Sequence, residues 1–448
     1  MFLANGPTWQ RQRAEFKRHM LRPEAAHSFP ALFNPIVGDF VEHLRDRANA
    51  DSSRIIEFAD ADALLHRFAF DCITQLFFGR RFFRFTRSES DASATGHVET
   101  QKLSGVQTVE AQAFMDSVMQ IFRGCLSFFY VPVGLSRALR TPRWTRFTRY
   151  FQTLFSFAEA LVDEKATTVQ TATASNSSST SETGVVGRIL ADRSLARDDV
   201  VASVVDIMGA AVDSTAVALQ WALYLFARNP DKQAALREEV LRVMGSSSES
   251  KIGSDQLQQM PYLKATVKEV LRLYPVIPLI GRVTQKPVEM EGGYNFATGT
   301  QFNVVTVAAG RSEEIFERAD QFVPDRWLRT KHETPTANGE HSVSSSTSKN
   351  TRSVCPVGFG LAATREATTG PEPDGINRYS SMAFGFGSRS CIGRRVAEAE
   401  LYLMIANLVR RFRVLPPAGV APADYRVGDK WQVLLLPKTP IRVRLQLI

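Results

Sequence analysis

The sequence predicts a mostly α-helical fold with small β-sheets. Apolar residues at helical spacing dominate roughly the first three hundred residues. One apolar stretch, residues 198–229, is long enough to cross a whole domain as a single helix. Short strand-like runs appear only after that stretch. With 448 residues, 44% of them hydrophobic, the chain can bury one large core, which excludes a largely disordered or coiled-coil protein.

Charge and cysteine content exclude several classes of function. Lys and Arg number 54 against 46 Asp and Glu, and the net charge of +8 favours an acidic partner or an anionic membrane. No basic block is long enough for a nucleic-acid arm, so we expect no nucleic acid partner. The four cysteines form no C-x-x-C pair, which argues against a disulfide scaffold or a zinc site. A metal would have to be held by a lone cysteine.

The helices are predicted from apolar residues spaced three and four positions apart. Before residue 198 this pattern covers residues 16–20, 29–44, 63–78 and 113–122. The long helix over 198–229 ends at Asn229-Pro230, and further helices cover 262–274 and 396–409. Asp206 and Asp213 interrupt the longest apolar stretch, so we expect no transmembrane helix.

Strand-like runs at 288–290, 301–307, 432–436 and 441–447 predict a small antiparallel sheet beside the helices. Tracts rich in Ser and Thr at 167–184, 245–255 and 332–375 predict surface loops or insertions. We interpret the longest, His332–Gly375, as a low-complexity insertion within a single domain that spans residues 1–448. The motifs before and after this tract belong to one set, described below, and this argues for a single domain.

The sharpest local signal is F-G-F-G-S-R-S-C-I-G-R-R, residues 384–395, which directly precedes a predicted helix. The helix N-terminus and nearby backbone N–H groups would lower the pKa of the Cys391 thiol. Gly387 and Gly393 permit a tight backbone whose face is open to a planar ligand, and Arg389 can reach a carboxylate on that ligand. A lone cysteine at a helix start is otherwise most often a buried structural residue.

This F-x-x-G-x-R-x-C-x-G segment resembles the haem-binding loop of the cytochrome P450 superfamily, the haem-thiolate monooxygenases. The resemblance implies the P450 fold, with a long central helix over haem b (iron protoporphyrin IX). It implies Cys391 as the iron ligand and Phe384 among the cofactor contacts, with Gly387, Arg389 and Gly393. Cys355 precedes a second Gly-rich stretch but lacks the upstream Phe and Arg, and we assign it no role.

An aspartate within the long apolar helix is costly unless it has a task. A satisfied buried Asp, or a helix bend stabilised by serine, would also explain it. Beside the cysteine loop, A-A-V-D-S-T at 210–215 resembles the family's A-G-x-D-T-T motif for oxygen activation. The resemblance implies that Asp213, Ser214 and Thr215 serve proton delivery. The segment departs from the motif at Ala211, where Gly is usual, and at Ser214, where Thr is usual.

Two further sites resemble haem propionate contacts of the family. Trp9 and Arg13 lie at i and i+4, on one helix face, and match W-x-x-x-R. Arg282 stands where the family has a second arginine. Either arginine alone would also fit a solvated surface charge.

An acid and a base three residues apart on a helix, Glu269 and Arg272, can form an ion pair. Buried charge needs a further partner. By resemblance Arg326, in F-V-P-D-R-W, completes the family's structural triad. We interpret this triad as scaffold and not as catalytic.

Within the superfamily, the chain resembles the mitochondrial clan, which takes electrons from an acidic ferredoxin. Lys264 and Lys268, at i and i+4, match the clan's docking lysines, and Arg394 and Arg395 lie in an adjacent motif. Helix lysines are also commonly just solvated, and a flavoprotein reductase is the alternative partner. Arginines recur every third residue from 137 to 149, interleaved with aromatic residues. They suit peripheral membrane contact, and equally a solvated basic surface.

We therefore expect a monomeric haem-thiolate monooxygenase that inserts one oxygen atom from O2 into a small apolar substrate, such as a sterol, lipid or terpenoid. The alternatives are a haem-thiolate isomerase or dehydratase, and a haem-binding protein without catalysis. By resemblance it lies at the mitochondrial inner membrane, with the endoplasmic reticulum as the alternative. Family members carry an anchor or presequence, sheet strands and first helices ahead of the W-x-x-x-R helix. We expect the chain to be truncated at its N-terminus.

Overall fold

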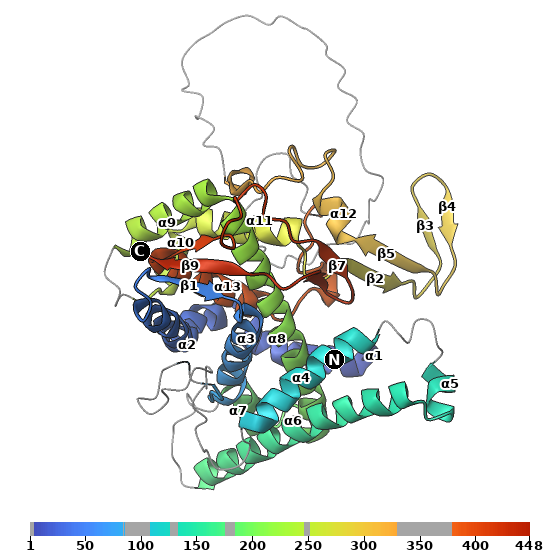
Figure 1. Ribbon diagram of the computed structural model, residues 1–448. Helices are drawn as coiled ribbons and strands as arrows, with labels where there is room; N and C mark the ends of the chain where they lie inside the picture. Colours follow the sequence, from blue (N-terminus) through green and yellow to red (C-terminus); the bar gives the residue numbers. More distant parts are fainter. Residues whose placement is uncertain are drawn as a thin grey trace, which may run out of the picture.

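The computed structural model describes residues 4–83, 85, 108–125, 133–174, 184–245, 251–328 and 379–448 (Figure 1). Its α-helices are α1 (Gly6–Met20), α2 (Pro23–Asn49), α3 (Ala61–Phe78), α4 (Thr108–Cys125), α5 (Val133–Ala138), α6 (Pro142–Ala174), α7 (Gly184–Ala191), α8 (Arg197–Arg228), α9 (Pro230–Met244), α10 (Ser254–Gln258), α11 (Pro261–Leu273), α12 (Thr306–Gly310) and α13 (Arg394–Arg411). The strands are short, and the prediction of a mostly α-helical fold with small sheets is confirmed.

Helix α8 passes through the middle of the molecule, and α3, α6, α11 and α13 pack against it (Figure 1). Its predicted span is confirmed to within a residue at each end. The Asn229 side chain donates to the carbonyl oxygen of Leu225 at 2.8 Å, and Pro230 opens the next helix. By length and composition α8 could cross a membrane, but 67% of its most apolar window is buried inside the molecule. It therefore serves as the core helix.

The strands form four small antiparallel sheets within the described ranges. They are β1 (Ile55–Phe58), β2 (Leu279–Val283), β3 (Val288–Met290), β4 (Tyr294–Phe296), β5 (Gln301–Val305), β6 (Phe412–Leu415), β7 (Asp429–Trp431), β8 (Leu435–Pro437) and β9 (Val443–Leu447). The three-stranded sheet has the order β1-β9-β6, with Leu445 opposite both Ile56 and Val414. Pairs β2-β5, β3-β4 and β7-β8 form the others.

Several sequence expectations differ from the structure. Strand β1 lies ahead of the long helix, although strand-like runs were expected only after it. Residues 167–174, expected as a loop, continue α6. The hydroxyls of Thr167 and Thr168 donate to carbonyl oxygens four residues earlier, so this polar helix end satisfies its own hydroxyl groups. The expected strand 301–307 ends at Val305, where α12 begins, and a bend between β7 and β8 takes up residues 432–434 of the expected strand 432–436. The proposed insertion at 332–375, with Cys355, lies outside the described residues.

Candidate functional site

The Cys391 segment folds into a closed loop ahead of α13. The backbone N–H of Cys391 donates to the carbonyl oxygen of Phe384 at 2.8 Å. Gly385 and Gly387 both adopt φ of +68°, which side chains rarely tolerate. A Cβ on Gly387 would meet nothing within 4 Å, so the left-handed backbone alone explains this glycine. Gly393 has an ordinary φ of −86°, and it lies directly before α13.

The Cys391 thiol is exposed even though protein atoms surround it. Burial raises its pKa, and this outweighs the backbone N–H of Gly393 and the positive charge of Arg13, which lower it. The expectation of a lowered thiol pKa is therefore wrong for this structure, because desolvation of the thiolate costs more than the helix start returns. An exposed thiol surrounded by protein suits a side chain that faces a bound ligand.

Helix α1 brings two of the predicted cofactor contacts to this loop. Arg13 Nη2 donates to the carbonyl oxygen of Ser390 at 2.8 Å. The Arg389 guanidinium lies 3.8 Å from the ring centroid of Trp9, and its Nη2 donates to the carbonyl oxygen of Ala4 at 2.9 Å. Residues far apart in the sequence thus lie together next to the cysteine.

Arg282 reaches the same region from β2. Its guanidinium lies 5.6 Å from the ring centroid of Phe386, in the cysteine loop. Burial, and then the positive charge of Arg282, lower the pKa of Arg389. Two guanidinium groups that repel each other beside the cysteine loop suit a ligand that carries carboxylates. A porphyrin with an iron for the thiolate and propionates for the arginines fits this set of residues.

The three predicted proton-delivery residues of α8 have different partners. Asp213 is buried and contacts His66 of α3. The Ser214 hydroxyl donates to the carbonyl oxygen of Ala210 at 2.7 Å, within its own helix. The Thr215 hydroxyl donates to Glu400 of α13 at 2.8 Å. Consecutive helix residues project about 100° apart, so the structure spreads these side chains around α8 and does not gather them at one point.

Glu400 is a residue that the sequence analysis missed. It is buried, and burial raises its pKa to about 8 despite the hydrogen bond from Thr215. Its Oε1 atom has no hydrogen-bond partner among the described residues. An acid between apolar residues in a predicted helix was the available signal, by the same argument that selected Asp213.

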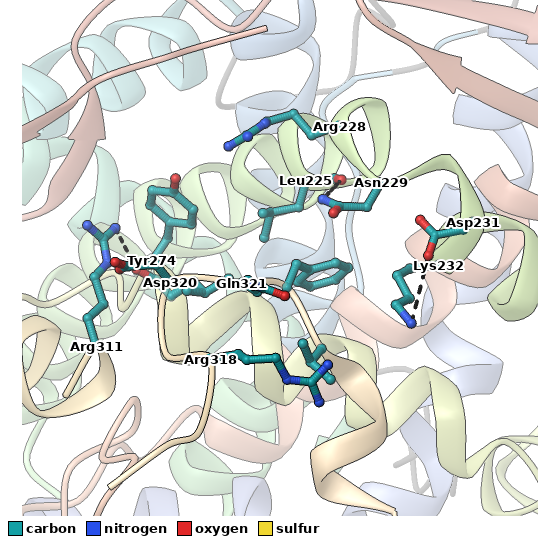
Figure 2. Close-up of a pocket in the computed structure, with 13 residues that line it drawn as sticks. Leu225, Arg228, Asn229, Asp231, Lys232, Tyr274, Arg311, Arg318, Asp320 and Gln321 are labelled. Atoms are coloured by element: carbon teal, nitrogen blue, oxygen red, sulfur yellow. Dashed lines mark hydrogen bonds and ion pairs between the residues drawn. The ribbon is translucent and has the colours of Figure 1, made fainter. Parts of the chain in front are cut away.

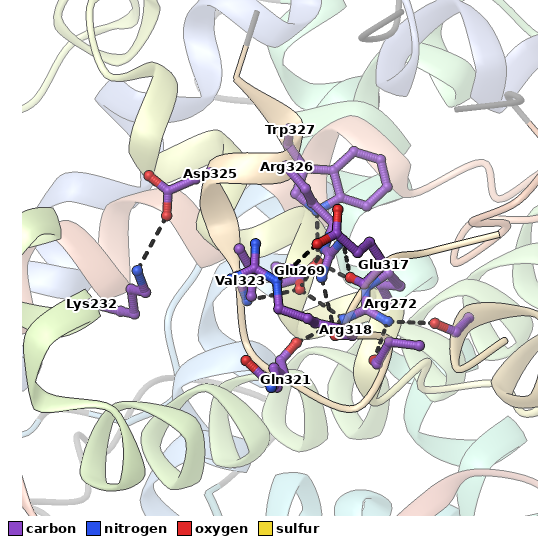
Figure 3. A network of polar contacts seen from close by, with 12 residues as sticks. Lys232, Glu269, Arg272, Glu317, Arg318, Gln321, Val323, Asp325, Arg326 and Trp327 are labelled. Atoms are coloured by element: carbon purple, nitrogen blue, oxygen red, sulfur yellow. Dashed lines mark hydrogen bonds and ion pairs between the residues drawn. The ribbon is translucent and has the colours of Figure 1, made fainter. Parts of the chain in front are cut away.

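The predicted triad is assembled around Glu269, which is fully buried (Figure 3). Arg272 donates from Nε to Oε2 at 2.8 Å and from Nη2 to Oε1 at 2.7 Å. Arg326 Nε donates to Oε1 at 3.0 Å. The indole N–H of Trp327 and the backbone N–H of Val323 donate to the same carboxylate, at 2.8 and 2.9 Å. This carboxylate links α11 to the 3-10 helix η3 (Pro324–Trp327).

The expected docking residues are half-buried and not freely exposed. Burial lowers the pKa of Lys264, while Glu239 and Glu398 raise it. The Lys268 ammonium lies 5.4 Å from the ring centroid of Trp327. Arg394 Nε pairs with Glu398 at 2.9 Å, and its neighbour Arg395 is half-buried. The Glu398 carboxylate thus pairs with Arg394 and also contributes to the electrostatics of Lys264.

A pocket of about 540 Å³ lies elsewhere, at the C-terminal end of α8 (Figure 2). Its lining includes Arg228, Arg311, Arg318 and Asp320, and none of the predicted site residues. Arg311 already donates to the carbonyl oxygen of Leu273 and pairs with Asp429 at 3.4 Å. This pocket is therefore separate from the cysteine loop.

The helical fold and the cysteine loop with its arginines define a haem-thiolate type of protein. The family model for cytochrome P450 matches residues 1–445. The chain therefore belongs to the cytochrome P450 family. The family binds haem b through a cysteine thiolate, and this chain is accordingly a P450-type monooxygenase, an oxidoreductase.

Curated relatives are similar over nearly the whole chain. Mitochondrial sterol 26-hydroxylase of Mus musculus is 27% identical, over 99% of this chain and 71% of that protein. Mitochondrial 25-hydroxyvitamin D-1 alpha hydroxylase of Homo sapiens is 28% identical, over 99% and 75%. Mitochondrial cholesterol side-chain cleavage enzyme of Capra hircus is 28% identical, over 97% and 69%. A crystal structure of another cytochrome P450 aligns with a TM-score of 0.66 at 18% identity, over 99% of this chain and 80% of that one, and it supports the fold.

Proposed function

We propose that this protein hydroxylates a small apolar substrate of the sterol or secosteroid type, with electrons from an acidic ferredoxin. The observation that carries the monooxygenase chemistry is the exposed Cys391 thiol with Arg13 and Arg389 next to it. The names of the three relatives support the substrate class and a mitochondrial location. We propose that it acts as a monomer at the inner membrane.

In this proposal Cys391 ligates the iron, and Arg13, Arg389 and Arg282 hold the propionates. Trp9 and Phe384 pack at the edge of the site. The haem, when bound, supplies the activation of dioxygen. Gly385 and Gly387 permit the left-handed backbone that shapes this loop.

The residues of α8 hold and move protons in this proposal. Ser214 is half-buried and keeps its hydroxyl near the backbone of Ala210, from which it can turn toward a bound ligand. Asp213 is the acid beside it. Thr215 serves instead to bind Glu400, so its part is to hold α8 against α13.

Electron supply is proposed at the surface formed by α11 and the start of α13. Lys264 and Lys268 with Arg394 and Arg395 give this surface a positive charge suited to an acidic carrier. The Arg-rich segment at α5 and α6 has exposed apolar neighbours, Val133, Leu135 and Leu139. Apolar and basic side chains together suit peripheral contact with an anionic membrane.

The test is product formation by the haem-loaded protein with cholesterol and with 25-hydroxyvitamin D under three electron supplies. A ferredoxin with its reductase should give hydroxylated product, and a flavoprotein reductase should give less. Product without any electron source would contradict monooxygenation and indicate an isomerase or dehydratase. A haem-replete protein that turns over neither substrate with either supply would contradict the proposed substrate class.

A further inference from the structure

A buried histidine faces the acid of α8. His66 of α3 is 7% exposed and Asp213 is 4% exposed. His66 Nε2 lies 3.2 Å from Asp213 Oδ1, and α3 packs along α8. The two atoms are within hydrogen-bond distance, and Oδ1 has no other donor among the described residues.

The contact of the other ring nitrogen, Nδ1, determines how many protons the His66–Asp213 pair holds. His66 Nδ1 lies 2.7 Å from the backbone carbonyl oxygen of Asp62, which can only accept a hydrogen bond. Nδ1 must therefore carry a hydrogen. An ionised Asp213 also accepts only, so an attractive contact with Nε2 needs one more proton, on Nε2 or on Oδ1. The pair thus stores one proton next to Ser214.

The surroundings favour the charged ring. Burial on its own lowers the pKa of His66, but the Asp213 and Asp62 carboxylates together raise it above its ordinary value. Asp213 faces the ring from α8, and Asp62 faces it from the preceding turn of α3, with Oδ1 3.4 Å from Nδ1. Helices α2 and α7 also pack on α3, and within the described ranges they form no ion pair with the ring.

We propose that His66 is the proton donor that resupplies Asp213, an inference that rests on the proposed function. The Nε2–H bond breaks, an O–H bond forms on Asp213 Oδ1, and the imidazolium becomes a neutral imidazole. His66 is a positioning residue, because it acts through Asp213 and not on substrate or cofactor.

The lost proton is restored from solvent by way of Asp62. That carboxylate is 59% exposed, and Gln220 Nε2 holds it with a hydrogen bond of 2.8 Å. A half turn of the ring about its Cβ–Cγ bond breaks the Nδ1–H contact with the Asp62 carbonyl oxygen and moves Nε2 to the former place of Cε1, on the side of the ring that faces Asp62. The carboxylate takes a proton from water and passes it to that nitrogen. Asp62, His66 and Asp213 then connect the molecular surface with the buried face of α8.

The first test measures the protonation of His66 without turnover. Histidine labelled with ¹⁵N in the haem-loaded protein gives ring signals for the seven histidines, and His66→Gln assigns the signal of His66. We expect that signal to titrate above the ordinary histidine range and to fall to lower pH in Asp213→Asn. His27→Gln, at an exposed histidine, should leave the His66 titration unchanged. A His66 titration that is the same in the parent and in Asp213→Asn would overturn the proposal.

The second test measures product formed per electron consumed, across pH, in His66→Gln and in the His27→Gln control. Glutamine can donate a hydrogen bond to Asp213 but cannot release a proton at these pH values. We expect the coupled rate to fall about tenfold or more, as for other positioned proton donors, and to lose its decline as pH rises through the His66 titration. A variant that keeps the parent's rate and pH profile would overturn the proposal.

These two tests separate the inference from the function on which it rests. If His66 titrates as expected but the parent forms no product with any electron supply, the proposed function is contradicted and His66–Asp213 is a structural ion pair. If the parent forms product and His66→Gln keeps the parent's rate and pH profile, the proposed function stands and the proposed relay is wrong.

Discussion

Thr215 of the central helix donates its hydroxyl hydrogen to Glu400 of α13 over 2.8 Å, and this bond joins α8 to the helix that follows the Cys391 loop. Both residues are buried. The Glu400 carboxyl has a pKa of about 8, so near neutral pH it is mostly protonated. A neutral carboxyl can remain in this apolar contact, whereas a carboxylate would lack a partner for Oε1.

Glu400→Gln should change how stability depends on pH. The folded-state pKa of Glu400 lies above its unfolded value, so its favourable contribution is complete at pH below the unfolded pKa and is lost as pH rises through about 8. Glutamine does not ionise, and so the variant should be close to the parent at pH 5 and more stable than the parent at pH 9. Urea unfolding at the two pH values measures this. Equal losses at both would show that Glu400 does not titrate in the folded protein.

Gly310→Ala should destabilise the protein, because a Cβ there would lie 2.5 Å from the backbone oxygen of Arg272. That contact is below any normal separation and involves backbone in the triad helix, so we expect a loss of about 1–3 kcal/mol. Gly38→Ala, in α2 with nothing within 4 Å, is the matched control and should instead gain about 0.5–1 kcal/mol. Denaturant unfolding of both variants compares them. A neutral Gly310→Ala would mean that α12 can move away from α11 freely.

Reversing Lys264 and Lys268 to Glu should weaken ferredoxin binding and flatten its salt dependence, mainly through the association rate. The exposed Lys286→Glu makes half of that charge change, on the turn before β3, and should have little effect. Binding measured at several salt concentrations checks both variants. Undiminished affinity with an unchanged salt slope would place the electron carrier on another surface.

Ser214→Ala should retain haem but divert electrons into hydrogen peroxide, because the hydroxyl that can turn from Ala210 toward the cofactor side is lost. Ser214→Thr should keep coupling or improve it, since the extra methyl restricts the side-chain rotamers. Product per electron and peroxide yield are measured together on each variant. If Ser214→Ala couples as well as the parent, the proton route bypasses this hydroxyl.

The sequence was sufficient for residues whose roles follow from helical spacing or from a continuous motif. Glu269 and Arg272 lie three apart on one helix, and the structure pairs them. Trp9, Arg13 and Arg389 lie together as the family pattern implied. Contacts between distant elements were harder to predict, because one chain gives no sign of which buried side chains meet. The pairs Thr215–Glu400 and His66–Asp213 span 185 and 147 positions, and neither follows a local pattern.

The effects of burial on ionisable side chains were also not predicted from the sequence. A cysteine before a helix suggested a lowered pKa for Cys391, but in the folded chain burial has the largest effect and raises that pKa. Two lysines at i and i+4 suggested an exposed pair, but both are half-buried, with Trp327 5.4 Å from the Lys268 ammonium and burial lowering the pKa of Lys264. Desolvation depends on the atoms that surround a group, and those come from other elements.

The central claim is that Cys391 is the thiolate ligand of the haem iron. The direct test is the carbonyl complex of the reduced, haem-loaded protein, whose Soret band is strongly red-shifted only with a thiolate ligand. The parent and the control Cys125→Ser, at the half-buried cysteine of α4, should both show that band, and Cys391→His should lose it while still binding haem. A red-shifted band that survives in Cys391→His, or that disappears only in Cys355→Ser, would contradict the account.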